Sequence, residues 1–186
     1  MKISLLTYNL NTKDGGGRFS FDLVSNLKSA GQEIKILTNS DILKNPLLNF
    51  FKIRKIINSS DIIHAIDIWP NGFYARLISL GLRKPIIITA LGTYSVAPFY
   101  SWRRPIMKWI CSGARIIAIS DYTKEKILEI LPKLKIEVIT LGFDLDFWSG
   151  ETYRSPTSRS LEVGLQQRYH PYILSVGALK SRKGYH

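Results

Sequence analysis

The sequence predicts an α/β protein with a doubly wound, Rossmann-like parallel sheet. Apolar, β-branched runs alternate with segments of helical period along the chain, and this order is typical of right-handed βαβ crossovers. The runs at 86–88 and 116–119 are apolar without alternation, as expected for strands that are covered on both faces. Ligands of such sheets bind at the carboxyl ends of the strands, so the loops that follow the strands are where we expect a site.

The expected elements follow one another in strand–helix order. Strands are predicted where isoleucine, leucine and valine form short runs, at 3–8, 34–38, 62–66, 85–90, 115–120 and 136–140. Helices are predicted where apolar residues recur at helical spacing, at 19–30, 47–57, 71–81, 105–111 and 122–131. Ser120 precedes the last of these helices and has the residue type of an N-cap.

The chain is expected to hold one domain and the start of another. We predict a Rossmann-like domain over 1–150, followed at 151–170 by a linker or exposed loop without a clear period. Residues 171–186 are then expected to form an apolar strand and a turn at Gly177, and they include a basic cluster. A strand that runs through a glycine turn into a helix start favours phosphate binding. We therefore expect the beginning of a truncated second domain, whose lobe would close over a nucleotide.

Composition narrows the class of protein. With 45% hydrophobic residues the chain is an ordinary globular protein. Cys111 is the sole cysteine, so an intrachain disulfide is excluded and a reducing compartment is expected. The N-terminus enters a strand pattern directly, without the features of a signal peptide. The sequence thus predicts a cytoplasmic protein.

The net charge of +12 is unevenly distributed. Between Ile68 and Ser120 there are seven basic residues and no acidic one. Such a field attracts anions, which leaves a nucleotide diphosphate, an acidic membrane surface and nucleic acid as candidate partners. A basic surface that only keeps the protein in solution is the plain alternative. Nucleic-acid binding rests on charge alone, because no known binding module is recognisable, so we expect no nucleic-acid partner.

A glycine-rich loop after the first strand is the first candidate site. It spans 9–18, includes Gly15, Gly16 and Gly17, and ends at Arg18 before a helix expected to begin near Phe19. Glycines let a ligand approach the backbone, and the helix start offers unpaired N–H groups. The loop therefore suits a phosphate or a sugar hydroxyl, although a flexible turn explains it as well. It is not the dinucleotide-binding fingerprint.

Several motifs together resemble the N-terminal half of the GT-B-fold glycosyltransferases of family four. They are, in the family's order, GGRF at 16–19, DIIHA at 61–65, TALGTY at 89–94, AISDYT at 118–123, VITLGFD at 138–144 and VGALKSRKG at 176–184. The last is similar to the strand and loop that open the family's C-terminal, donor-binding domain. The resemblance covers essentially the whole chain.

The resemblance implies transfer of a sugar from a nucleotide-diphosphate sugar to a glycan or lipid-linked acceptor, with retention at the anomeric carbon. Basic groups and helix N-termini would stabilise the departing diphosphate. No metal or other cofactor is expected, because His64, His170 and His186 lack ligand-like spacing.

Site residues are carried over by position. On the donor side the resemblance implies Lys183 as the lysine that holds the diphosphate, with the glycine loop, Arg18 and Gly142 nearby. His64 is the expected catalytic residue; a core histidine bonded to a backbone carbonyl is the alternative. The acceptor side is expected to comprise Tyr8, Asp67, Thr93, Tyr94 and Ser120, although N-capping explains Ser120 better.

The chain also departs from the family pattern. Ile66 and Leu91 stand where the family usually has histidines, and Ala178 replaces a common arginine, for which Lys180 or Arg182 can substitute. These changes leave a second hypothesis open: a non-catalytic subunit that docks on a membrane or binds the acceptor.

Aromatic and basic residues are interspersed in two segments, 45–57 and 99–110. Such segments are typical of surfaces that lie against anionic lipid, but also of helices with aromatics in the core and charges in water. We expect an enzyme of lipid-linked or surface polysaccharide synthesis, peripheral at the inner face of the membrane. Because the family's paired-glutamate signature lies further on, this chain alone is expected to bind weakly and not to turn over.

Overall fold

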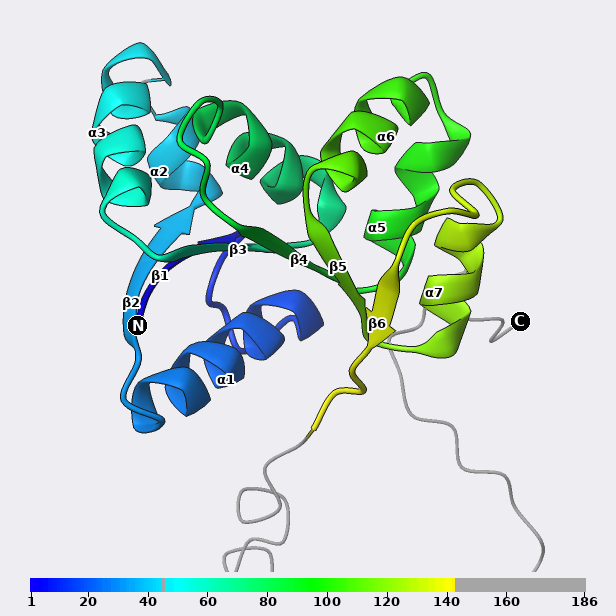
Figure 1. The fold of residues 1–186 in the computed structure, drawn as a ribbon. Helices are drawn as coiled ribbons and strands as arrows, with labels where there is room; N and C mark the ends of the chain where they lie inside the picture. The colour runs from blue at the N-terminus through cyan, green and yellow to red at the C-terminus, as the bar shows by residue number, and fades with distance from the viewer. Residues whose placement is uncertain (45, 143–186) are drawn as a thin grey trace, which may run out of the picture. The chain divides into compact units, whose positions relative to one another are not determined.

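The computed structural model describes residues 1–44 and 46–142 and shows a six-stranded, all-parallel sheet (Figure 1). The strand order is β2-β1-β3-β4-β5-β6. The chain builds the sheet from β1 to β2 in one direction and from β3 to β6 in the other. This arrangement confirms the predicted doubly wound, Rossmann-like α/β class. The strands are β1 (Lys2–Thr7), β2 (Glu33–Thr38), β3 (Ile62–Ile66), β4 (Ile86–Ala90), β5 (Arg115–Ala118) and β6 (Ile136–Val138).

The six strands predicted within the first domain are confirmed, with differences at their ends; the linker expected at 151–170 and the strand and second-domain start expected at 171–186 lie outside the described residues. The fifth and sixth strands were expected to reach residues 120 and 140, but β5 ends at Ala118 and β6 at Val138. At the end of β5 the reason is local, because Ser120 already serves as the N-cap of the next helix. Strands β5 and β6 therefore end two residues before the apolar runs that predicted them.

Helices cover the two faces of the sheet unequally (Figure 1). The helix α1 packs through Val24 against Leu5 and Ile66 in a small apolar cluster. The larger core cluster lies on the opposite face, and most of the remaining helices contribute to it. The helical elements are α1 (Gly15–Ser29), α2 (Asn39–Leu43), α3 (Pro46–Asn58), η1 (Ile68–Gly72), α4 (Phe73–Ile78), α5 (Thr93–Val96), η2 (Ala97–Tyr100), α6 (Arg104–Ser112) and α7 (Asp121–Leu128).

Strand alternation decides which side chains enter which layer. In β3, Ile63 and Ala65 belong to the larger core, whereas Ile66 belongs to the cluster under α1. His64 lies between Ile63 and Ala65 and so faces the α1 side. The register pairs Ile66 with Thr89 and Leu5 with His64, which places the polar side chains of β3 and β4 on the same face.

The helices differ from the sequence-based expectation more than the strands do. The first helix begins at Gly15, not near Phe19, so the glycines form its first turn and the expectation of a glycine loop was wrong. The helix expected at 71–81 is split into η1 and the shorter α4. The elements α2, α5 and η2 were not predicted, because segments of four or five residues are too short to show a helical period. Among the described residues, no helix has the length and apolar character needed to cross a membrane.

Candidate functional site

The candidate site lies at the carboxyl ends of the strands, beginning with the start of α1 behind β1. Asp14 is the N-cap of this helix, and its carboxylate accepts a 2.6 Å hydrogen bond from the Gly17 amide. The hydroxyls of Thr7 and Ser20 lie 2.7 Å apart and join the end of β1 to the second turn of α1. The helix start is thereby fixed next to the strand end, where ligands of doubly wound sheets bind.

The three glycines differ in their surroundings. A Cβ at Gly17 would collide with the Asn11 backbone and with the Asn9 side chain, so only glycine fits there. A Cβ at Gly15 would meet nothing within 4 Å, and one at Gly16 would meet only the Asp14 carboxylate at 3.7 Å. Gly15 and Gly16 are exposed. The first turn is therefore open at two positions and closely packed at the third.

Arg18 follows the glycines in the same helix. Its Nε donates to Asp22 Oδ2 at 2.8 Å, one helical turn further on. The guanidinium is thus held along α1 by its own helix. A phosphate at the start of α1 would compete with Asp22 for this side chain.

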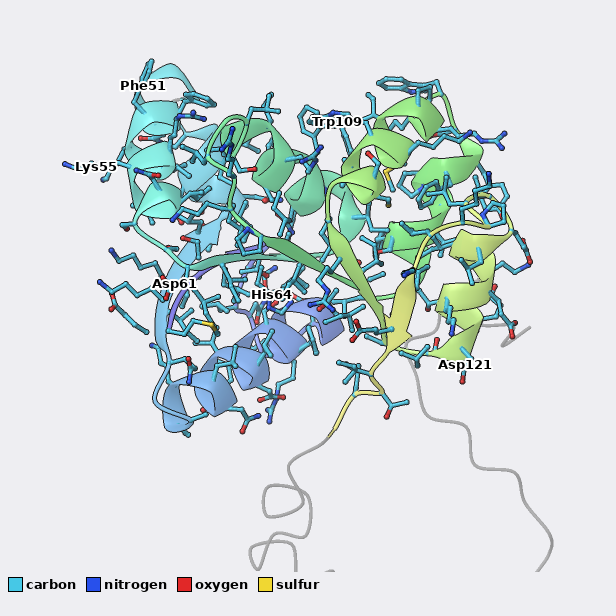
Figure 2. The ribbon with its side chains drawn as sticks, viewed as in Figure 1. Phe51, Lys55, Asp61, His64, Trp109 and Asp121 are labelled. Atoms are coloured by element: carbon cyan, nitrogen blue, oxygen red, sulfur yellow. The ribbon has the colours of Figure 1, made fainter. Side chains whose placement is uncertain are left out.

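His64, the expected catalytic residue, belongs to β3, and its side chain lies between the sheet and α1 (Figure 2). Its Nε2 lies 2.8 Å from the Thr89 hydroxyl on the neighbouring strand. The histidine precedes the end of β3 by two residues, so its ring is set back from the edge of the sheet. The alternative, a core histidine bonded to a backbone carbonyl, was wrong about the partner, which is a threonine hydroxyl, and the side chain is partly buried.

Burial decides the charge of His64. The surrounding apolar groups lower the pKa of its imidazole to about 4, because the charged form loses its hydration. No acidic side chain within the described part of the chain is bonded to the ring to offset this loss. The imidazole is neutral at physiological pH and can act as a hydrogen-bond donor or acceptor, or as a base for a group that reaches it.

Asp67 follows β3 directly and ties two loops together. Its Oδ1 accepts hydrogen bonds from the Leu91 amide at 3.0 Å and from the Ser95 hydroxyl at 2.6 Å. Burial raises the pKa of this carboxyl, while the bonds from Ser95 and Leu91 work in the opposite direction. The backbone of Asp67 has φ 70° and ψ 148°, a conformation that costs a non-glycine residue free energy and recurs at functional sites.

The loops after β4 and β5 also meet at this edge. Ser120 accepts a 3.2 Å hydrogen bond from the Thr123 amide, which confirms it as the N-cap of α7. Gly92 has φ 102°, and a Cβ there would lie 3.9 Å from the Thr123 hydroxyl. The first turn of α7 therefore lies against the turn that follows β4.

The sequence model of Glycosyltransferase Family 4 matches residues 39–147, more than half of the chain. The chain belongs to glycosyltransferase family 4. The matched segment starts at α2 and includes every strand from β3 onward. The family 4 domain therefore contains His64, Asp67 and Ser120, whereas the glycines of α1 lie ahead of the matched residues.

Solved structures agree with this assignment at the level of the fold. This family 4 chain is similar to HepE from Anabaena in complex with UDP and glucose, with a TM-score of 0.55 and 17% sequence identity. The likeness covers 80% of this chain and 46% of HepE. A second HepE structure, in complex with UDP, gives the same values. The chain thus spans about half the length of HepE, and no curated protein sequence matches it at a significant level.

Two positions of the family 4 domain that were expected to be polar are apolar and packed. Ile66 is buried in the cluster with Leu5 and Val24, and Leu91 packs against that cluster. The histidines common at these positions in the family are thus replaced by a continuous apolar contact with α1. Among the described residues, Thr89 is the polar partner of the His64 ring.

The remaining predicted residues are not all joined into one cluster. Tyr8 and Tyr94 are exposed, at 69% and 68%, after β1 and within α5. Thr93 begins α5. Gly142 is exposed at the end of the described residues, and Lys183 with its basic neighbours lies outside them. No group of three or more histidine, cysteine, aspartate or glutamate side chains in the described part of the chain is placed to hold a metal.

Sequence reasoning missed two features beside this edge. Ser95 is fully buried and bonded to Asp67, but no sequence signal links residues so far apart in the chain. Arg103 stacks on the rings of Trp69 and Trp102, with its guanidinium carbon 5.1 Å from each ring centroid. The interspersed aromatic and basic residues at 99–110 were the only signal of this stack.

Proposed function

We propose that this domain is the acceptor-side half of a retaining glycosyltransferase, which moves a sugar from a nucleotide-diphosphate sugar to a glycan or lipid-linked acceptor. The single observation that carries the proposal is the family 4 match over residues 39–147. The matched residues include the loops that follow β3, β4 and β5 at the carboxyl edge of the sheet. The complexes of HepE with UDP and glucose support a nucleotide-sugar donor. We place the reaction in the cytoplasm, in lipid-linked or surface polysaccharide synthesis.

The residues present suit the departure of a diphosphate. The exposed first turn of α1 at Gly15 and Gly16 offers backbone N–H groups and the positive end of the helix dipole. These groups stabilise negative charge that grows on the leaving phosphates. Gly142 and Lys183 are proposed to complete the donor side, and Tyr8, Tyr94 and Ser120 to border the acceptor.

His64 has a narrower proposed role. Its imidazole is neutral because burial lowers its pKa, so it can bond a sugar hydroxyl without attracting the diphosphate. Its position behind the edge of the sheet requires the acceptor or sugar to reach inward past Asp67.

A second candidate function is favoured by one specific observation. Ile66 and Leu91 pack into an apolar cluster where the family usually carries histidines, as expected if the chain kept the fold and lost the chemistry. The domain would then bind an acceptor or a membrane without transferring sugar.

Release of nucleoside diphosphate from a panel of nucleotide-diphosphate sugars distinguishes the two. The complete protein that carries this domain is mixed with glycan and lipid-linked acceptors. The transferase proposal expects turnover with at least one donor, and Gly16→Asp should lower kcat/KM at least about tenfold by placing a carboxylate at the helix start. Asn26→Asp adds the same charge further along α1, where the residue is exposed, and serves as the matched control.

The two outcomes are clear-cut. Absence of turnover with every donor, in a folded protein that still binds acceptor, overturns the transferase proposal and favours the second candidate. An equal loss of kcat/KM in Gly16→Asp and Asn26→Asp would show that the start of α1 is not part of the donor site.

A further inference from the structure

Arg103 lies against two indole rings and has no anionic partner among the described residues. Its guanidinium carbon lies 5.1 Å from the ring centroids of Trp69 and of Trp102. No hydrogen bond or ion pair joins this guanidinium to a described residue, and its Nε is buried without an acceptor. The indoles stabilise the cation, but they cannot accept its N–H groups in the plane of the guanidinium.

More cations and aromatic rings surround this stack on the exposed side. Arg104 and Lys108 in the first turns of α6 are exposed. The side chains of Trp102 and Tyr100 are 75% and 64% exposed. We call these five residues the basic rim: Tyr100, Trp102, Arg103, Arg104 and Lys108.

The rim is separate from the buried face of α6. Met107, Ile110 and Cys111 enter the core, and Trp109 packs against that core and against the Arg76 side chain. The core explanation for the aromatics of this segment therefore holds for Trp109. It does not hold for Trp102 and Tyr100, whose rings remain exposed to water, an unfavourable state that contact with a partner would relieve. The Tyr100 hydroxyl donates a 3.2 Å hydrogen bond to Glu129 Oε2, so the acidic neighbour of the rim is bonded to Tyr100 and not to Arg103.

A second aromatic and basic segment on α3 differs in its charge balance. Phe51 is 74% exposed, and Lys52 and Lys55 are exposed as well. Figure 2 labels Phe51 and Lys55 on this helix. However, the pKa of the Asp41 carboxyl is lowered, chiefly by the hydrogen bonds from Thr38, and the charge of nearby Lys52 adds to this lowering. The charge of α3 is thus partly compensated within the protein, whereas the Arg103 guanidinium has no such partner among the described residues.

We propose that the basic rim binds the surface of an anionic phospholipid membrane. The rim combines the two components of interfacial binding: an exposed tryptophan and tyrosine suited to the headgroup level, and cations that attract a negative leaflet. Phosphate oxygens supply the acceptors that Arg103 lacks. Trp69, which carries the stack, follows Asp67 by two residues, so a bound membrane lies beside the carboxyl edge of the sheet. The inference does not depend on sugar transfer.

Vesicle binding by the whole chain tests the proposal. Vesicles of phosphatidylcholine with and without phosphatidylglycerol are sedimented with the protein at low and high salt. Binding is expected only with phosphatidylglycerol and should weaken with salt, because exposed charges are screened. Each cation contributes about five-fold in affinity, so the triple change Arg103→Gln, Arg104→Gln and Lys108→Gln should weaken binding about 100-fold. Trp102→Ala should weaken it at least about ten-fold.

The α3 segment provides matched controls. Phe51→Ala removes an aromatic ring of nearly the same exposure as Trp102. The double change Lys52→Gln with Lys55→Gln removes two positive charges from α3, which packs against the same core cluster as α6. These variants should change vesicle affinity less than about two-fold and five-fold respectively. A circular dichroism melt confirms that each variant is folded.

Three results would overturn the inference. One is equal binding to vesicles with and without phosphatidylglycerol. Another is a loss of binding in the α3 variants as large as in the rim variants, which would move the contact to α3. The third is tighter, rim-dependent binding to a single-stranded RNA than to the vesicles, which would identify a nucleic acid as the partner.

Discussion

The Ser95 hydroxyl donates a 2.6 Å hydrogen bond to Asp67 Oδ1, across 28 residues of chain. The same oxygen accepts the Leu91 amide, and Ser95 Oγ accepts the Ile68 amide at 3.3 Å. These bonds hold the loop after β3 to the segment after β4. They also maintain the unusual backbone conformation of Asp67, since the surrounding structure must over-determine such a residue.

Ser95→Ala should destabilise the protein. It removes the donor to a buried carboxylate and the acceptor of the Ile68 amide, and the expected loss is about 1–3 kcal/mol in the free energy of unfolding. Chemical denaturation measures this loss. A change below a few tenths of a kcal/mol would show that water replaces the serine hydroxyl.

Asp67→Asn should behave differently, because asparagine has nearly the same shape and keeps an oxygen acceptor for both donors. Burial raises the pKa of Asp67, so the stability it contributes is present below its unfolded pKa of about 3.9 and is lost as pH rises through the folded pKa. At pH 7 the variant should be as stable as the native protein or more stable. A large loss at pH 7 would mean that the negative charge itself is required.

His64 should make stability depend on pH in the opposite sense. Its folded pKa is lowered to about 4, so the stability it contributes is present above its unfolded pKa of about 6.5 and is lost as pH falls toward 4. Between these two pH values the free energy of unfolding should fall by up to about 3 kcal/mol. Denaturation at a series of pH values should show this slope in the native protein and not in His64→Gln.

Thr89→Val is the control for this titration. It removes the hydrogen bond to His64 but leaves the burial that lowers the pKa. The slope should therefore persist. A His64 resonance that titrates near pH 6.5 in the native protein would contradict the assignment of a buried, neutral ring.

Gly17→Ala and Gly15→Ala form a matched pair in one helical turn. The Cβ of Gly17→Ala collides with Asn11 and Asn9, and the expected loss is about 1–3 kcal/mol. Gly15→Ala meets open space and should stabilise the helix by up to about 1 kcal/mol. Thermal melts measure both, and equal melting temperatures would show that the turn at 9–11 adapts.

Ser120→Ala should cost about 1 kcal/mol, because the Thr123 amide loses its acceptor. Ser120→Asp retains an acceptor at the N-cap and should restore most of that stability. A matching loss in both variants would point to a role of the serine hydroxyl other than capping.

Much of the fold could be predicted from the sequence, because a parallel sheet covered on both faces requires long apolar strands. The runs at Ile63 and Ile88 therefore marked β3 and β4 correctly. The start of α1 was missed because glycine is a poor helix former, and the Asp14 cap that offsets this weakness becomes clear only from its bond to Gly17.

The site was harder to predict, since its contacts join residues far apart in the chain. A resemblance to the family pointed to His64 and Ser120, but neither Thr89 beside His64 nor Ser95 beside Asp67 has a local signal. The spatial partners depend on the register of β3 and β4 and on the path of the loop after β4. Neither the strand register nor the loop path can be read from the periodicity of the sequence.

The all-parallel strand order has a consequence for how the chain reaches its native state. Even the pair of strands nearest in sequence, where Ile116 pairs with Ile136, is separated by a whole helix, and Ile3 pairs with Ile62 at the centre of the sheet. No hairpin exists in this sheet to nucleate folding locally. Loop-closure entropy must be lost before these distant pairs form, so the domain should refold more slowly than a helical bundle of the same length. During that interval the isoleucine-rich strands are exposed to other copies of the chain.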